Sequence, residues 1–513
     1  MTIVNTNVAA LSAQSSMMKN AKEMEDAMAK LSSGHRINTA ADDAAGLSIS
    51  ERMESQVRGL SQAIRNAEDA QNMIDAVEGG SAEIVTSLQR LKELAVQAAS
   101  TTNTSTDRSF IQQEAGQLIQ EIDRIAEETS WNGQAVLNGR FDGKDVQVGV
   151  NGGNSIQVGV SSQKSGDIGN YFLKGEGVET SAAAAAASNG RSGGAVRIAG
   201  FAGEATFTSR AGDSARLHAA DINAVSHLTG VTADARTHAK ISSLSVEGTI
   251  QLSIGNRNDA GIPQAAATTD DGTNIASVTT ITAIINVKED LTALRDAINN
   301  ASESTGVTAA LFEGMRDELI LTDHDGDDIV LSNFIHSAGA GTETIDVEAY
   351  DFHGLSATSS SSSQSLTQGG SDSTTILGNV NLSSSQEFKV IYAAADYHGS
   401  GTTQYSTFNN VGDIDLSTKI GAEKALATIQ NAINMVNTER AQLGATSNRL
   451  DKTINNLTSI VENTAASKSH IKDADFAAET SKLTKAQILN QAATSMLAQA
   501  NASKQTVLAL LQN

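Results

Sequence analysis

Four aspartates in one short segment form the densest group of metal-binding side chains in this sequence. Asp323, Asp325, Asp327 and Asp328 surround Gly326, and carboxylates at alternating positions suit a hard cation such as Ca²⁺. The segment lacks the downstream bidentate Glu of a complete calcium loop, and Asp and Gly are also common in tight turns. We therefore favour a hairpin turn rich in Asp over a calcium site and predict no bound metal.

The other reactive side chains form no catalytic pattern. None of the nine histidines lies in an HExxH sequence, and no G-x-x-x-x-G-K-[ST] phosphate loop is present. The chain has no cysteine, which excludes a disulfide framework, a zinc-thiolate site and a thiol nucleophile. We predict that the protein is not an enzyme and needs no cofactor.

Charge divides the 513 residues into three parts. Residues 1–165 contain 14 bases and 21 acids, residues 166–417 contain 12 and 31, and residues 418–513 contain 10 and 7, so the middle accounts for most of the net charge of −23. An acidic chain without Lys and Arg clusters is a poor ligand for nucleic acid and for anionic membranes. We predict neither partner, and we interpret the middle as an insert between two segments of one kind.

The two ends are unusually poor in charge. Residues 1–18 and 486–503 contain no charged residue. Asn, Gln, Ser and Thr recur in both stretches, so neither resembles a membrane span, and the start lacks the basic and apolar regions of a secretory signal.

Apolar residues in these ends are spaced alternately by three and four, as in a coiled coil. A single helix of this kind would expose an apolar stripe, so we expect the two to pair with each other or with neighbouring copies. The predicted assembly seam consists of Val4, Val8, Leu11, Met24, Met28, Leu31, Leu483, Ala493, Leu497, Val507 and Leu511.

Longer helices are predicted farther inside the chain, over residues 42–100, 111–125 and 426–461, where the same spacing continues. Gly79 and Gly80 interrupt the first and could bend or break it. Between the second and third, residues 146–160 alternate apolar and other side chains around Asn151-Gly152-Gly153-Asn154, which predicts a β-hairpin. Together these segments predict an elongated helical bundle built from both ends of the chain.

The middle is rich in Gly, Ser, Thr and Ala, and it contains short alternating runs that predict strands, such as residues 246–255. A helix with apolar spacing from Val287 to Ala301 leads into a predicted hairpin within residues 307–332. Residues 182–187 and 356–367 are small or serine-rich and are typical of linkers. We predict two or more β-rich or α+β domains here.

Several segments, in this order, are similar to the signatures of bacterial flagellins. They are Arg36–Ser50, Ser87–Ser100, Arg440–Leu450, Ile471–Asn501 and Val507–Asn513. The resemblance covers about residues 1–165 and 418–513. It implies a mainly helical conserved core of long antiparallel helices, with β-rich or α+β outer domains inserted in the middle.

The resemblance also implies three domains. Residues 1–41 and 463–513 would form an inner coiled-coil assembly domain, residues 42–170 and 418–462 a helical bundle with a β-hairpin, and residues 171–417 the surface-exposed outer domains, one of which contains the helix-hairpin motif near residues 287–332. Uncharged ends fit such an assembly, because buried helices would otherwise have to desolvate charges.

The implied function is that of a structural subunit that self-assembles into the helical flagellar filament used for swimming. A hook-filament junction protein is the alternative. The implied partners are other copies of the chain, an export chaperone, the filament cap and hook-associated proteins. The implied location is extracellular, after export without a cleaved N-terminal signal.

One charged stretch allows two interpretations. Gln89, Arg90, Lys92, Glu93 and Leu94, with Glu114 on the next helix, form an ordinary solvated helix face by their charge pattern. The same residues resemble the patch of flagellins that a host toll-like receptor binds. That patch also lies in the contact between protofilaments of the family, so assembly alone could explain its presence.

Overall fold

The computed structural model describes residues 6–184, 189, 191, 193–257, 277–339, 343–358, 361–392 and 403–511, and it describes side chains at the C-terminus up to Ser503. Contacts divide the chain into two compact units. The first contains residues 1–76, 141–160 and 441–513, and the second contains residues 77–140 and 161–440. The three domains inferred from the resemblance stay a prediction.

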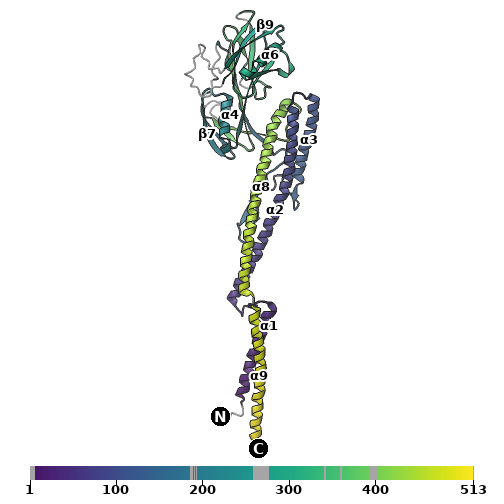
Figure 1. The fold of residues 1–513 in the computed structure, drawn as a ribbon, viewed down its shortest axis with the longest axis vertical. Coiled ribbons are helices and arrows are strands. Elements are labelled where there is room, and N and C mark those ends of the chain that lie inside the picture. The colour runs from purple at the N-terminus through teal and green to yellow at the C-terminus, as the bar shows by residue number, and fades with distance from the viewer. Residues whose placement is uncertain are drawn as a thin grey trace. The chain divides into compact units, whose positions relative to one another are not determined.

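Long helices come from both ends of the chain, and the middle is rich in strands (Figure 1). This arrangement confirms the predicted fold class. The long helices are α1 (Val8–Ser33), α2 (Ala44–Ala99), α3 (Ser105–Glu128), α8 (Lys419–Lys472) and α9 (Phe476–Leu511). Shorter helices in the middle are α4 (Ala215–Ala224), α5 (Ser226–Thr229), α6 (Thr292–Asn300), α7 (Ser302–Thr305) and the 3₁₀ turn η1 (Phe312–Gly314).

The strands of the described residues pair antiparallel throughout. Two small hairpins are β1 (Ser130–Trp131) with β2 (Gln134–Ala135), and β3 (Lys144–Gln147) with β4 (Ser155–Val158). One sheet has the order β10 (Ser277–Ile285), β9 (Gly248–Arg257), β13 (Asp328–His336), β16 (Thr374–Ile376), and another has β19 (Thr403–Tyr405), β18 (Lys389–Tyr392), β6 (Gly194–Gly200), β7 (Gly203–Ser209). The largest sheet has the order β11 (Val307–Leu311), β12 (Leu319–Asp323), β8 (Thr232–Ser242), β17 (Asn379–Ser384), β5 (Gly169–Lys174), β20 (Thr407–Asn410), and β14 (Thr344–Tyr350) joins β8 to β15 (Gln364–Thr367).

In the first unit, the beginning of α2 packs against the end of α8. Leu60 and Ala63 of α2 are buried against Leu457 of α8. Glu54 of α2 accepts a hydrogen bond from Lys468 of α8 at 2.5 Å. The hydrogen bonds from Lys468 and from Arg58 lower the pKa of Glu54 to about 2, so this carboxylate stays charged even in mildly acidic solution.

The predicted hairpin of this unit is confirmed. β3 and β4 pair with Gln147 opposite Ser155, and Gly153 in the turn between them has a φ of +90°, a conformation that glycine adopts without strain. The turn packs closely on α2 at Gly59. A Cβ atom added to this glycine would lie only 2.6 Å from Val150 Cγ1.

In the second unit, α2 runs through Gly79 and Gly80 as one helix, so of the predicted bend or break the break is wrong. Gly80 instead permits a close approach, since a Cβ atom there would lie 2.7 Å from Leu137 Cδ1. Burial of the flanking Val77 and Ile84 explains why the helix continues despite the low helix propensity of glycine.

The strand-rich part of the second unit has two apolar cores. One core lies among β8 to β16 and α6, and Leu294 and Ile298 of the predicted helix are buried in it. The other lies among β5, β6, β17, β18 and α4. Residues 356–367 are not entirely a linker as predicted, because β15 pairs with β14 and buries Leu366.

The aspartate-rich segment joins two sheets and is not a hairpin turn as predicted. β12 pairs with β11 and β8, whereas β13 pairs with β9 and β16. The Asp323 carboxylate accepts hydrogen bonds from the backbone N–H groups of Asp325 at 2.9 Å and Gly326 at 3.0 Å, so it organises the connection between the two sheets. Asp327 accepts hydrogen bonds from Ser214 and Arg216. Among the residues that the structure describes, no three His, Asp or Glu side chains are placed to hold a metal ion.

In the described residues, no helix combines the length and apolar character needed to cross a membrane.

Candidate assembly surface

Helices α1 and α9 form an antiparallel pair at the free ends of the chain (Figure 1). Asn7 Nδ2 donates to the Ala500 carbonyl at 3.2 Å, and at the other end of the pair the Arg36 backbone N–H donates to the Lys472 carbonyl at 2.7 Å. Both helices begin with a side-chain cap, because Asn7 accepts the Ala10 N–H and Asp475 accepts the Ala477 N–H. The start of each helix is therefore fixed by its own local sequence.

The face of each helix that contacts the other repeats every three and four residues. In α9, up to Ser503, the residues that are not exposed are Glu479, Leu483, Ala486, Asn490, Ala493, Leu497 and Ala500. The corresponding residues of α1 are Ala10, Ala13, Met17, Asn20, Ala21, Met24, Ala27, Lys30 and Leu31. Many of these side chains are small, which lets the two helices approach closely but buries little apolar area.

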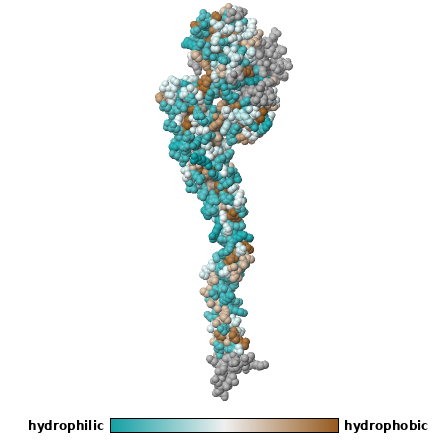
Figure 2. Space-filling view, turned by 180° about the vertical axis from the view of Figure 1, so that it is seen from behind, coloured by the Kyte–Doolittle hydropathy of each residue, from teal (hydrophilic) through white to brown (hydrophobic). Residues whose placement is uncertain are grey.

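A second set of apolar residues lies on the outside of this pair. In α1 these are Val8, Leu11, Met18 and Met28, and in α9 they are Phe476, Ile488, Leu489 and Met496. Leu11 is 57% exposed, Ile488 60% and Met496 65%. Apolar residues are visible on the surface near the terminal residues in Figure 2. We call these eight residues the outer stripe.

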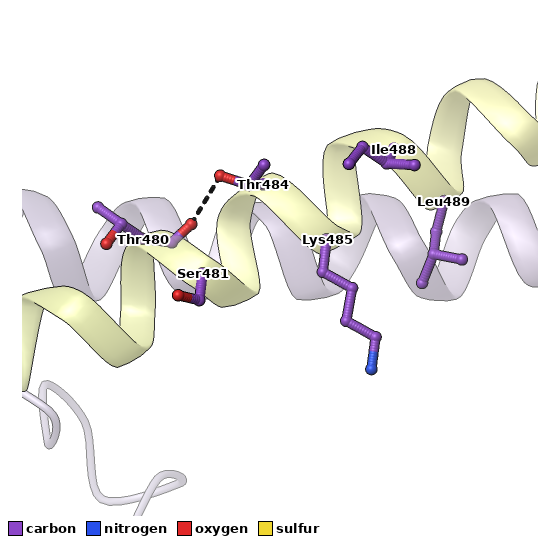
Figure 3. A pocket seen from close by; sticks show the side chains of 6 residues that line it. All are labelled: Thr480, Ser481, Thr484, Lys485, Ile488 and Leu489. Carbon is purple, nitrogen blue, oxygen red and sulfur yellow. Dashed lines mark hydrogen bonds between the residues drawn. The ribbon is translucent and has the colours of Figure 1, made fainter.

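Part of the outer stripe borders a shallow hollow of about 530 Å³ on α9. Figure 3 shows Ile488 and Leu489 at one end of it, one turn beyond Thr484 and Lys485. Thr484 Oγ1 donates to the Thr480 carbonyl at 2.9 Å, so this hydroxyl is satisfied within the helix and could be covered at little cost.

The predicted seam residues fall on two different faces. Met24, Leu31, Leu483, Ala493 and Leu497 lie on the contact between α1 and α9, whereas Val8, Leu11 and Met28 lie on the outer stripe. Val4 and the side chains of Val507 and Leu511 lie outside the described residues. The sequence analysis missed Met18, Phe476, Ile488, Leu489 and Met496, because these residues follow no regular helical repeat that would mark them.

The charged patch on α2 and α3 belongs to the second unit. Arg90 on α2 donates to Glu114 on α3 at 2.7 Å and to Glu93 at 2.9 Å. These hydrogen bonds, the one to Glu93 more than the one to Glu114, raise the pKa of the Arg90 guanidinium. Gln89 is exposed like these three residues, and Lys92 donates to Gln430 of α8 at 2.6 Å.

Leu94 of this patch is not a surface residue. Only 1% of it is exposed, so it packs inside the bundle of α2, α3 and α8. Exposed apolar side chains are nevertheless present close by: Val96 on α2 and Phe110 on α3. Two hydrogen bonds join the helices on either side of these residues: Arg90 donates to Glu114, and Arg108 Nε donates to the Ala98 carbonyl at 2.8 Å. Val96 lies between them along α2, and Phe110 lies between them along α3.

Comparisons with known proteins cover the whole chain. The bacterial flagellin N-terminal helical region matches residues 4–142, and the bacterial flagellin C-terminal helical region matches residues 426–511. B-type flagellin of Pseudomonas aeruginosa is 32% identical over 522 aligned residues, which cover 99% of this chain and 99% of the relative. Flagellin of Salmonella typhimurium is 30% identical over 520 residues, with the same coverage of both chains. A solved structure of FliC from Burkholderia pseudomallei aligns with 74% of this chain and 99% of that chain, at 18% identity and a TM-score of 0.29.

Proposed function

This chain belongs to the bacterial flagellin family and is a structural subunit of the flagellar filament used for swimming, and we propose that it polymerises with copies of itself through the outer stripe of α1 and α9. Two relatives that match it over their full length are flagellins, which favours the filament subunit over the hook-filament junction protein.

The observation that carries the proposal is that the α1–α9 pair leaves eight large apolar side chains outside its own contact. Met18, Met28 and Met496 are each more than half exposed, while the contact between the two helices combines alanines with Met17, Met24, Leu31, Leu483 and Leu497. The outer stripe also lies partly in stretches without charge, residues 6–18 and 486–503. A surface of this kind can be covered by another subunit without desolvating an ion.

The rest of the proposal concerns location and partners. The subunit acts outside the cell, and it meets an export chaperone, the filament cap and hook-associated proteins on the way. It catalyses no reaction. The acidic middle, with 31 acids against 12 bases, supports an exposed position, since like charges on neighbouring filaments repel each other.

A single substitution tests the assembly surface. Met496→Asp places a carboxylate on the outer stripe at a residue that makes little contact within its own chain. Burying that charge between subunits would cost several kcal/mol, so the variant should stay monomeric at concentrations where the wild type forms filaments of unlimited length. Sedimentation and negative-stain microscopy measure this.

Val246→Asp is the matched control, because Val246 is an exposed apolar residue in the middle of the chain. It should polymerise like the wild type. Filaments of normal length from Met496→Asp would refute the proposed surface. Leu497→Asp is a different test: Leu497 faces α1, so this change should also lower the helix content of the monomer, which circular dichroism measures.

Recognition by a host toll-like receptor is a second proposal, supported by the exposed ion pairs of Arg90 with Glu93 and Glu114. The monomer should activate the receptor and the filament should not. Arg90→Ala should weaken activation at least tenfold, about 1.4 kcal/mol, as expected for a central arginine of an interface. Equal activation by Arg90→Ala and wild-type monomers in a reporter assay would contradict this proposal.

A further inference from the structure

A cavity of about 690 Å³ lies in the second unit, between one face of the largest sheet and the first turns of α8. Strands β5, β8, β17 and β20 contribute to it, with the segment that follows β14 and with residues 423–428 of α8. Its volume is in the range of natural sites for small molecules. None of the assembly surfaces described above includes it.

The sheet face that lines the cavity is polar because the strands alternate. On β8, Ala235 points into an apolar core, whereas its neighbours Asp234 and Arg236 line the cavity. Register places Asn381 of β17 between Asp234 on one side and Lys174 of β5 on the other. The residues therefore form a continuous row of hydrogen-bonding groups across three strands.

The charges of the lining are balanced. The carboxylates are Asp234, Asp351 and Glu423, and the cations are Lys174, Arg236 and Lys424. Arg236 lies 3.8 Å from Asp234 and 4.0 Å from Glu423. Burial and, to a lesser degree, the nearby Lys424 lower the pKa of His353 to about 4, so its ring is neutral at pH 7. A ligand of high net charge would thus find no surplus of the opposite charge.

Two polar atoms at the wall of the cavity are buried without a hydrogen-bond partner among the described residues. They are Asn381 Oδ1 and His353 Nδ1. Buried polar atoms in folded proteins are nearly always satisfied, by protein, by water or by a ligand. An amide oxygen accepts, and a neutral imidazole nitrogen accepts or donates according to its tautomer, so a ligand group that donates a hydrogen bond would suit this part of the wall.

The cavity also contains two phenyl rings, those of Phe172 and Phe352. The Arg236 guanidinium lies over Phe352, with Cζ 5.1 Å from the ring centroid, so this ring is held in place. We propose that the cavity binds a neutral saccharide. Each sugar hydroxyl both donates and accepts hydrogen bonds, which suits a lining of mixed carboxylates, amides and cations, and the C–H face of a sugar ring packs on an aromatic side chain.

The test uses the full chain as monomer and a panel of methyl glycosides of glucose, galactose, mannose and N-acetylglucosamine. Saturation-transfer NMR and titration calorimetry should detect binding of at least one of them. Ala427→Trp fills the cavity from an exposed position on α8 and should weaken binding at least tenfold. The matched control is Ala441→Trp, an exposed alanine on the same helix that does not line the cavity, and it should bind like the wild type.

Asn381→Leu separates a ligand role from a structural one. It removes the unpartnered amide oxygen, so it should weaken binding at least tenfold while the thermal midpoint stays the same or rises. Binding of no glycoside, equal binding by Ala427→Trp and the wild type, or tighter binding of inorganic phosphate or free arginine would each overturn the proposal. All three variants should still polymerise, so this outcome is independent of the assembly proposal.

Discussion

Two residues of α2, two positions apart, allow a matched test of the helical bundle. Leu94 is 1% exposed and Val96 is 57% exposed. Replacing a fully buried leucine by alanine removes apolar contacts and leaves a cavity, which typically costs about 2–5 kcal/mol. Replacing an exposed valine by alanine in a helix changes stability by less than about 0.5 kcal/mol, and alanine has the higher helix propensity.

The assay is urea unfolding of the monomer, followed by circular dichroism. With a slope of roughly 3 kcal/mol per molar urea, a loss of about 3 kcal/mol lowers the midpoint of Leu94→Ala by about 1 M. Val96→Ala should keep the midpoint of the wild type. Equal midpoints for the two variants would refute the burial of Leu94 and would support the surface position that the sequence analysis assigned to this side chain.

Two further predictions concern the middle of the chain. In the first, residues 169–410 are excised and Ile168 is joined to Val411 through two glycines. The product should still polymerise in a sedimentation assay, because the ends to be joined are already close: the Val411 N–H donates to the Ile168 carbonyl at 3.0 Å. A folded product that stays monomeric would show that the middle contributes necessary contacts. Burial, and to a lesser degree the nearby Asp327, raise the pKa of Asp323 from 3.8 to about 6. The folded state therefore binds this proton more tightly than the unfolded state does. As the pH rises from about 4 to 6, ionisation of Asp323 destabilises the folded state. Asp323→Asn should therefore gain stability relative to the wild type over that range, by roughly 1–3 kcal/mol in denaturant unfolding, and a difference that is independent of pH would contradict the raised pKa.

The helical ends could be predicted from the sequence because their apolar residues repeat at helix spacing over many turns. The predicted helix over residues 42–100 is α2, Ala44–Ala99. The hairpin was predictable too, since its alternation and its glycine turn are local signals. Each of these elements is specified by residues close together in the chain.

The sheets of the middle could not be predicted in detail, since their pairing is not local. β8 pairs with β12, β14 and β17, which follow it at long separations in the sequence. The Asp-rich turn was assigned to a hairpin for the same reason: composition indicates a turn, but it does not say which strands the turn connects. β15 was missed because the serine-rich segment that contains it has the composition of a linker.

The assembly surface was predicted only in part. Spacing by three and four identifies one stripe per helix, and in α9 that stripe is the face that contacts α1. The side chains proposed to contact another subunit, such as Ile488 and Met496, lie off that face and follow no equally regular repeat. Which face contacts the same chain and which is left exposed depends on how α1 and α9 pair, and the pairing becomes visible only in the folded structure.

Labelling of a single cysteine at residue 496 tests the central claim most directly, because the natural chain has no cysteine. Met496→Cys should react quickly with a maleimide in the monomer, where the residue is 65% exposed, and should be protected in the filament. Tyr405→Cys, at an exposed position of β19, should react in both states and serves as the control. Equal labelling of residue 496 in monomer and filament would contradict the proposal that subunits meet through the outer stripe.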